Sequence, residues 1–363
     1  MRMTPFDEVL VDVTSRSPKL STAGYREHGR FPVIDQGASH TAGRTDDESL
    51  VTRADRPLIL FGDHTRRFKL IDEDFVVGAE GLKVLAVGTE HDARYVFHAL
   101  RSISLPDAGY SRHFKYLRRA RLPVVPRQQQ QRIAALLDQV DELRAKRRRT
   151  LALLDEWLAS EFHEAFGHAR WPEATIGDLL LSASYGSSTK AGPDGEFPML
   201  RMGNVTPEGR LDLKDLKYVD LADKERDKYL VRRGDLLFNR TNSVDRVGKT
   251  ALYDRGEPMA YAGYLIRLRL KPDNQPEYLA AFLNTKHTKA VLRSMAKSIV
   301  GMANINAKEL AAMKVPLPPA DAQRRFVTKV TAAASARTVA QQHLAKLDEL
   351  FASLQHRAFT GQL

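Results

Sequence analysis

The chain contains the same helical segment twice. Residues 126–168 align without a gap with residues 319–361, at an offset of 193. The agreement is densest between LDEWLASEFHEAF (154–166) and LDELFASLQHRAF (347–359), where 8 of 13 positions are identical. An internal repeat limits the architecture more strongly than local patterns do, because each copy must fold as an equivalent unit. The chain is therefore the product of a duplication.

Each helical segment closes a globular block, and the two blocks also resemble each other. FPVIDQG (31–37) matches FPMLRMG (197–203), and residues 109–126 lie opposite residues 302–319 in the alignment. The duplication therefore covers whole halves of the chain. We predict a first globular block, a first helix, a second globular block and a second helix, over residues 1–122, 123–168, 169–316 and 317–363.

Apolar residues recur at three- and four-residue spacing in both helical segments, which is typical of coiled coils. Each segment follows a proline, Pro126 or Pro319, which favours a helix start. Neither helix can bury its apolar stripe alone, so we predict that they pair as an antiparallel coiled coil, with parallel pairing left open. Antiparallel pairing places the blocks at opposite ends, in a pseudo-two-fold arrangement. The predicted stripes are Ile133, Leu137, Val140, Leu151, Leu154, Leu158 and Ala165, and Phe326, Val330, Ala333, Ala340, Leu344, Leu347, Phe351 and Leu354.

A basic run interrupts the first stripe. It extends from Arg144 to Arg149 and contains one alanine among five cations. We interpret it as a solvated basic stretch. Contact with DNA or with a partner subunit is the alternative.

Both blocks contain short runs rich in apolar and β-branched residues, bounded by Gly, Asp and Asn turns. Each block also contains a short helical pattern. We therefore predict an α+β fold, in which two mixed α/β blocks are separated by the long helices. The predicted strands include residues 58–61, 75–78, 235–238 and 264–270, and the predicted short helices are residues 94–102 and 276–296.

The chain has a formal net charge of +11 and a pI near 9.7. Such an excess favours polyanionic partners, because neutralising phosphates releases counterions. Surplus surface lysine and arginine is the alternative. The absence of cysteine excludes disulfides, thiolate metal sites and a cysteine nucleophile. With neither a long apolar run nor a secretory signal, we expect a cytoplasmic protein without membrane contact.

Two blocks, each followed by a helix that ends in LDE-x-x-AS-x-x-H-x-AF, resemble the specificity subunit of type I restriction–modification enzymes. The resemblance covers essentially the whole chain, although the first block is short and has LILFGDHTRRF in place of a fuller glycine- and asparagine-containing loop. Three further features carry the resemblance, namely Pro126, Gln130 and Arg132 at the first helix, the matching Pro319, Gln323 and Arg325 at the second, and the loop GDLLFNRTN (234–242).

The resemblance implies that each block is a target recognition domain, which reads one half of a bipartite, asymmetric site in double-stranded DNA. It also implies that the helices fix the spacing between half-sites and dock two methyltransferase subunits, with two restriction (helicase–nuclease) subunits left open. The chain itself would be a non-catalytic subunit that binds no cofactor. S-adenosylmethionine, ATP and Mg²⁺ would belong to its partners in DNA methylation and in defence against foreign DNA.

Base reading requires side chains that form hydrogen bonds at base edges, together with cations for phosphates. In the second block, such side chains follow the predicted strand 235–238. An ordinary polar turn is the alternative there, and helix capping is the alternative for the asparagines near residue 304. The candidate DNA-binding residues of the second block are Ser187, Ser188, Thr189, Lys190, Arg201, Asn204, Asn239, Arg240, Thr241, Asn242, Ser243, Lys297 and Asn304.

The first block offers two polar loops and a short basic segment. Arg112, His113 and Lys115 of this segment are candidate phosphate contacts. The candidate DNA-binding residues of the first block are Ser39, His40, Thr41, Arg44, His64, Thr65, Arg66, Arg67, Arg112 and Lys115.

No catalytic motif accompanies these candidates. Gly248-Lys249-Thr250 resembles the end of a phosphate-binding loop, but Ser243 stands where its first glycine is required. His163 and His356 occupy matching helix positions, and we interpret them as packing or interface residues rather than as a catalytic or metal pair. The alternative function is a coiled-coil DNA-binding scaffold without sequence specificity. A nuclease is the third possibility, but it lacks a recognisable acidic metal site.

Overall fold

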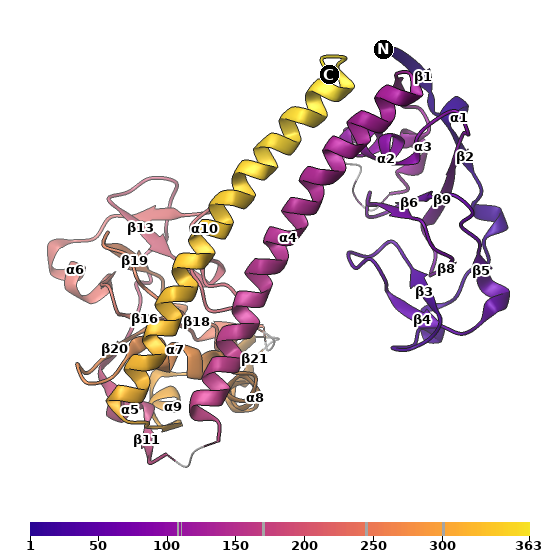
Figure 1. Cartoon of the computed structure of the whole chain (residues 1–363). Coiled ribbons are helices and arrows are strands. Elements are labelled where there is room, and N and C mark those ends of the chain that lie inside the picture. Colours follow the sequence, from indigo (N-terminus) through magenta and orange to yellow (C-terminus); the bar gives the residue numbers. More distant parts are fainter. Residues whose placement is uncertain (107–108, 110, 169–170, 244–245, 300–301) are drawn as a thin grey trace. The chain divides into compact units, whose positions relative to one another are not determined.

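The computed structural model forms two compact units (Figure 1). Unit 1 consists of residues 1–148 and 342–363, and unit 2 consists of residues 149–341. Each unit therefore combines one globular block with part of each long helix. The structure describes the whole chain except residues 107–108, 110, 169–170, 244–245 and 300–301.

The two repeated segments are helices of 40 residues each, α4 (Arg127–Phe166) and α10 (Ala320–Phe359). Within unit 1, Arg144 Nε lies 2.6 Å from Asp348 Oδ1, and Gln129 Nε2 donates to the carbonyl of Leu363 at 2.7 Å. Earlier residues of α4 thus meet later residues of α10, so the helices run antiparallel.

The same direction holds within unit 2. There the rings of Phe162 and Phe326 lie 5.4 Å apart, and Asp155 pairs with Arg337. The predicted antiparallel pairing is confirmed within each unit.

The residues through which α4 and α10 contact each other, called the seam below, depart from the predicted apolar stripe in two places. Ala165 is exposed, and Phe162 and Phe166 are buried instead, because their rings pack against Tyr278 and Phe326. The prediction for Ala165 was wrong because heptad spacing counts positions and takes no account of side-chain size. The large rings of Phe162 and Phe166, on the neighbouring face of the helix, make the contact instead.

The second departure is Arg144, whose side chain is only 15% exposed. Its guanidinium pairs with Asp141 and Asp348 and lies 4.4 Å from the ring centroid of Phe351. The interpretation of residues 144–149 as a solvated stretch is therefore wrong for Arg144. Carboxylates on both helices and an aromatic face satisfy the cation within the seam.

In unit 1, two four-stranded sheets and one two-stranded sheet build the globular block. The larger sheets have the orders β2-β9-β6-β7 and β4-β3-β8-β5, and β3 and β8 are parallel. The strands are β1 (Arg2–Pro5), β2 (Leu10–Asp12), β3 (Phe31–Ile34), β4 (Gly43–Thr45), β5 (Val51–Thr52), β6 (Leu58–Gly62), β7 (Phe68–Ile71), β8 (Phe75–Val77), β9 (Leu82–Val87) and β10 (Arg121–Val124), of which β1 pairs with β10. The helices are α1 (Phe6–Val9), α2 (Ala93–Ser102) and α3 (Phe114–Leu117).

Unit 2 repeats these three sheets and adds a three-stranded sheet of order β17-β22-β21. Its sheets have the orders β12-β20-β16-β18 and β14-β13-β19-β15, again with one parallel pair, and β11 pairs with β23. The strands are β11 (Glu173–Thr175), β12 (Leu180–Tyr185), β13 (Phe197–Leu200), β14 (Lys217–Val219), β15 (Leu230–Val231), β16 (Leu236–Asn239), β17 (Thr241–Asn242), β18 (Thr250–Leu252), β19 (Met259–Tyr261), β20 (Leu265–Leu270), β21 (Lys297–Ile299), β22 (Met302–Asn304) and β23 (Lys314–Pro316). The helices are α5 (Ile176–Leu179), α6 (Asp223–Tyr229), α7 (Pro276–Asn284), α8 (Lys286–Met295) and α9 (Ala307–Ala311).

The predicted helix 276–296 is two helices. Thr285 is extended (φ −62°, ψ 150°) and separates α7 from α8. Its hydroxyl accepts from the Thr288 amide, which caps α8. The apolar pattern continues through the break because both helices pack on one core, so periodicity alone missed it.

Each block is anchored to the helices in the same way. In unit 1, the Tyr95 hydroxyl donates to the carbonyl of Pro123 at 2.9 Å, and its ring lies edge-on to Phe359 at 5.5 Å. In unit 2, Tyr278 donates to Pro316 at 2.7 Å and meets Phe166 at 4.9 Å. Each helix therefore ends against the block of the other repeat.

The glutamines recognised in the sequence also have one shared role. Gln130 accepts from the amide of Asp92, before α2, and donates to the carbonyl of Val125. Gln323 accepts from the amide of Gln275, before α7, and donates to the carbonyl of Pro318. These buried amides fasten the start of each long helix to its own block.

Candidate nucleic-acid interface

In the second block, several chain segments meet where β16 ends. The amide of Arg240 donates to the carbonyl of Tyr264 at 3.1 Å, and its carbonyl accepts from Ile305 at 3.0 Å. Directly after it, Thr241 and Asn242 form β17, which pairs with β22. The structure therefore brings together the predicted residues Arg240, Thr241, Asn242 and Asn304.

Tyr185, at the end of β12, completes this group. The guanidinium carbon of Arg240 lies 4.6 Å from the Tyr185 ring centroid. The Tyr185 hydroxyl accepts from the backbone amide of Ala307 at 2.9 Å, at the start of α9. Tyr185 is still 41% exposed, so its ring supports the arginine at a solvent-facing position. Sequence reasoning missed Tyr185, because it lies far from Arg240 along the chain.

Polar atoms in this group lack hydrogen-bond partners among the described residues. Asn239 is fully buried, and neither the nitrogen nor the oxygen of its side-chain amide is bonded. The Nε atom of Arg240 and the Oδ1 atom of Asn304 are also buried and unbonded. Such groups are rare in folded proteins because each costs about 1–3 kcal/mol. Several of them lie close together where β16 ends.

The predicted segment 187–190 is bonded to residues 261–263, directly before Tyr264, which accepts from the Arg240 amide. Ser187 is buried, and its amide donates to the carbonyl of Tyr261 at 2.8 Å, while its carbonyl accepts from Gly263. Its hydroxyl accepts from the amide of Thr189 at 3.1 Å. The remaining side chains of the segment are exposed, namely Ser188, Thr189 and Lys190.

Two predicted residues of the second block have other contacts. The buried Asn204 amide nitrogen donates to the carbonyls of Asp212 and Asp215, and its oxygen accepts from the amide of Arg201. The guanidinium of Arg201 pairs with Asp215 at 2.9 Å. These contacts hold a turn, so DNA contact by Arg201 and Asn204 stays a prediction without further support.

The last predicted residues of this block lie at the edges of the group. Ser243 is exposed and follows Asn242, whose side-chain oxygen accepts from the Ser243 amide at 2.9 Å. Lys297 pairs through the backbone of β21 with Asn304 of β22. Both positions therefore border the segments that surround Arg240.

Lys249 has a structural role. Its ammonium group donates to the carbonyl of Met202 at 3.1 Å and also to that of Val205. Burial lowers the pKa of Lys249 below its ordinary value. This side chain holds the turn at residues 202–205 rather than facing an incoming phosphate.

In the first block, cations line a cleft of about 470 Å³. The cationic side chains are Arg66, Arg67, Lys69 and Arg101, of which Arg101 pairs with Asp141 at 2.6 Å. Lys69 is buried and donates to the carbonyl of Ser39 at 2.6 Å. The two predicted loops of this block therefore lie together, joined by a lysine that sequence reasoning did not single out.

The turn before β7 is fixed by several bonds. The hydroxyl of Thr65 donates to the carbonyl of Gln36 at 2.8 Å, and the amide of His64 donates to the Gln36 side chain at 3.2 Å. Arg66 has φ of 59°, a left-handed conformation that a residue with a side chain rarely adopts. This backbone holds Arg66 and Arg67 at the cleft.

The other candidates of the first block differ in exposure. Arg44 donates to the carbonyls of Gly29 and Arg30, which is a structural contact. His113 is fully buried, with Nδ1 3.0 Å from the carbonyl of Asp63, so its proposed phosphate contact is wrong. The remaining candidates lie at solvent-accessible positions, namely His40, Thr41, Arg112 and Lys115.

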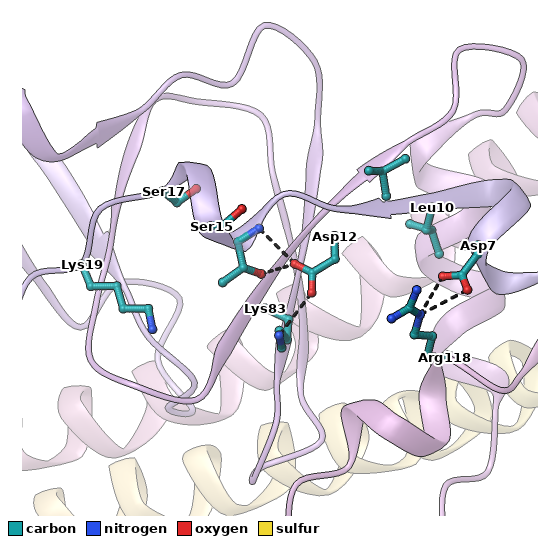
Figure 2. Close-up of a pocket in the computed structure, with 10 residues that line it drawn as sticks. Asp7, Leu10, Asp12, Ser15, Ser17, Lys19, Lys83 and Arg118 are labelled. Atoms are coloured by element: carbon teal, nitrogen blue, oxygen red, sulfur yellow. Dashed lines mark hydrogen bonds and ion pairs between the residues drawn. The ribbon is translucent and has the colours of Figure 1, made fainter.

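A larger cavity of about 920 Å³ lies elsewhere in the first block (Figure 2). Here the cations are neutralised within the block. Arg118 pairs with Asp7 at 2.9 Å, Lys83 pairs with Asp12 at 3.1 Å, and Lys19 pairs with Glu80 at 3.0 Å. In the cation-lined cleft, the exposed Arg67 forms no ion pair with any described residue, so it is the better candidate for contact with a polyanion.

Metal sites and membrane spans are two other possibilities for the described part of the chain. Within it, no three His, Cys, Asp or Glu side chains are grouped to hold a metal ion. Nor does any helix there have the length and apolar character needed to cross a bilayer.

Comparisons with known proteins agree with this geometry. Residues 170–348 match the family described as the type I restriction modification DNA specificity domain. The chain is 29% identical over 204 residues to the EcoKI specificity subunit of Escherichia coli (strain K12), which covers 54% of this chain and 44% of that protein. It is 25% identical over 239 residues to the StySPI specificity subunit of Salmonella potsdam, with coverage of 63% and 51%. The matched regions span about half the length of these curated relatives or less.

Solved structures show the same fold. The S subunit of a type I restriction–modification system from M. genitalium has a TM-score of 0.62 at 15% identity, over 99% of this chain and 96% of that chain. A chain from a structure of type I system assembly and conformational transition has a TM-score of 0.50 at 17% identity, over 100% and 98%.

A duplicated block, each copy closed by a long helix, is the fold that this chain shares with the S subunit from M. genitalium. Residues 170–348 match the type I restriction modification DNA specificity domain, and the chain is similar to curated specificity subunits of type I restriction enzymes, as the sequence resemblance predicted.

Proposed function

We propose that this chain is the sequence-specific DNA-binding subunit of a type I restriction–modification complex and reads a bipartite, asymmetric site. The observation that carries the proposal is the repetition of one topology with unlike loops. At the strand end after β6, the amide of Asp63 donates to Gly81 and its carbonyl accepts from His113. At the strand end after β16, Arg240 makes the same two backbone bonds with Tyr264 and Ile305.

The hairpins that follow these equivalent positions also correspond. Each closes on a left-handed residue, Arg66 (φ 59°) in the first block and Gly248 (φ 83°) in the second. The first hairpin is short, whereas the second is longer and contains β17. One scaffold that presents two different loops is what two unlike half-sites require.

The helices are proposed to dock two methyltransferase subunits. Trp157 of α4 and Leu350 of α10 occupy equivalent positions of the repeat, and both are exposed, at 40% and 46%. Large apolar side chains exposed at the same place in both repeats suit a partner that binds in two copies. Catalysis and its cofactors, S-adenosylmethionine and, with restriction subunits, ATP and Mg²⁺, are assigned to these partners.

The proposal is tested by selection from random DNA duplexes with the purified chain at fixed salt, since salt sets non-specific affinity. We expect a two-part motif with an unspecified spacer. The alternative, a coiled-coil scaffold that binds through charge, predicts no enriched motif and equal competition by any duplex of the same length.

A further inference from the structure

We propose that Arg240, positioned by Tyr185, reads a guanine in the half-site bound by the second block. The inference rests on the proposed function and adds the chemistry of one base contact. It assigns Arg240 as a specificity-determining residue and Tyr185 as a positioning residue.

Arg240 is held in place but is not neutralised. Its guanidinium lies over the Tyr185 ring, and it forms no ion pair with any described residue. Tyr185 is in turn fixed through its hydroxyl by the amide of Ala307. A guanidinium stacked on a ring keeps its plane and its donors directed, so it loses less conformational entropy on binding.

Arg240 also has polar neighbours whose hydrogen bonds are not all formed. Arg240 Nε and Asn304 Oδ1 have no partner among the described residues, and both residues are partly exposed, whereas Asn239 is fully buried and only adds a polar group behind them. A phosphate requires only positive charge, whereas a base edge requires donors and acceptors in fixed positions. The neighbouring amides therefore favour a base over the DNA backbone.

The guanidinium group of an arginine matches the edge of one base in particular. Arginine donates two parallel hydrogen bonds to O6 and N7 of guanine in the major groove, which no other base accepts in the same way. The equivalent residue of the first block is Asp63, which is 5% exposed and whose carboxylate accepts from the amide of Phe114 at 2.7 Å. The first block therefore cannot read guanine from this position, and the two half-sites should differ.

The experiment uses the full chain and the duplex that the wild-type chain selects. Affinity is measured for that duplex and for duplexes with each base pair of the second half-site replaced. For Arg240→Ala and Arg240→Lys, we expect discrimination at one G·C pair to fall on the order of 10- to 100-fold, because the bidentate contact is lost. Discrimination throughout the first half-site should stay unchanged, which also shows that the variants are folded.

Tyr185 is tested by paired substitutions. Tyr185→Phe keeps the ring and should retain discrimination at that G·C pair, whereas Tyr185→Ala removes the support and should weaken it. The matched control is Arg233→Ala, an exposed arginine before β16, at the opposite end of the strand from Arg240. It should weaken binding equally for all duplexes or leave it unchanged.

Two results would overturn the inference. One is unchanged discrimination in Arg240→Ala. The other is a uniform loss at every base pair together with a shallower salt dependence, which identifies a phosphate contact. If the wild-type chain selects no two-part motif, the proposed function fails first, and that result is distinct from either of these.

Discussion

Arg144 and Asp348 form an ion pair across the helix seam of unit 1, with Nε and Oδ1 2.6 Å apart. The repeat places Arg337 and Asp155 at the equivalent positions, and they pair across the seam of unit 2. The cation lies on α4 in one pair and on α10 in the other. The duplication therefore produced reciprocal contacts, which fix the antiparallel register twice.

We predict that Asp348→Asn lowers the free energy of unfolding by about 1 kcal/mol, because Arg144 is largely buried and loses a directed partner. Urea unfolding of the full chain measures the loss. The adjacent exposed Glu349 is the control, and Glu349→Gln should change stability far less. If the two substitutions had equal effects, the Arg144–Asp348 ion pair would contribute no more to stability than an exposed carboxylate does.

Phe166→Ala should destabilise unit 2 by about 3–5 kcal/mol, since the ring is 5% exposed and packs on Phe162, Tyr278 and Phe326. The equivalent Phe359→Ala should cost less, because Phe359 is only partly buried. Thermal unfolding of both variants compares the two docking sites. A larger loss for Phe359→Ala would contradict this order.

Stability should also depend on His98, which is 1% exposed and contacts Asp138 Oδ1 at 2.7 Å. Burial lowers the pKa of His98 below its ordinary 6.5, outweighing the opposing effects of the Asp138 hydrogen bond and charge and of Asp141, while Arg101 lowers it further. The unfolded chain therefore takes up this proton first as pH falls. The contribution to stability is complete above about pH 6.5 and is lost as pH decreases through the lowered pKa.

The check is the melting temperature of the wild type and of His98→Gln between pH 7.5 and 5. The wild type should lose more stability toward pH 5 than His98→Gln, which cannot be protonated. His163→Gln, at an exposed position of α4, should keep the wild-type slope. Parallel slopes for the wild type and His98→Gln would exclude this role of His98.

If DNA binds in the cation-lined cleft of the first block, the salt dependence of DNA affinity should change when a cation there is removed. Arg67→Ala should reduce the slope of log affinity against log salt by about 1, because one phosphate contact is lost. Arg118→Ala is the matched control, since Arg118 is paired with Asp7 and lines the charge-neutralised cavity. Equal slopes for the two variants would show that DNA does not use the cleft.

Much of the fold could be predicted because its signals are periodic. The two long helices, the strand at residues 58–61 and the helix at residues 94–102 follow from apolar spacing and lie at β6 and α2 as expected. The break at Thr285 could not be predicted in this way, because a single cap overrides a pattern that otherwise continues.

The candidate site was predicted only in part. Loops rich in Asn, Arg and Ser identify where polar groups gather, but not which of them are already bonded. Asn204 and Asn239 look alike in the sequence, yet Asn204 is fully bonded and Asn239 is not. Tyr185 and Lys69 were missed because their contacts join segments that are far apart in the chain.

The central claim, that one chain reads two unlike half-sites for a methyltransferase, is tested most directly by sequencing methylated bases in host DNA. The comparison is between cells with this chain, cells in which it is deleted, and cells in which it is restored. We predict one interrupted, asymmetric two-part motif that disappears on deletion and returns on restoration. A contiguous palindrome, or methylation unchanged by the deletion, would contradict the claim.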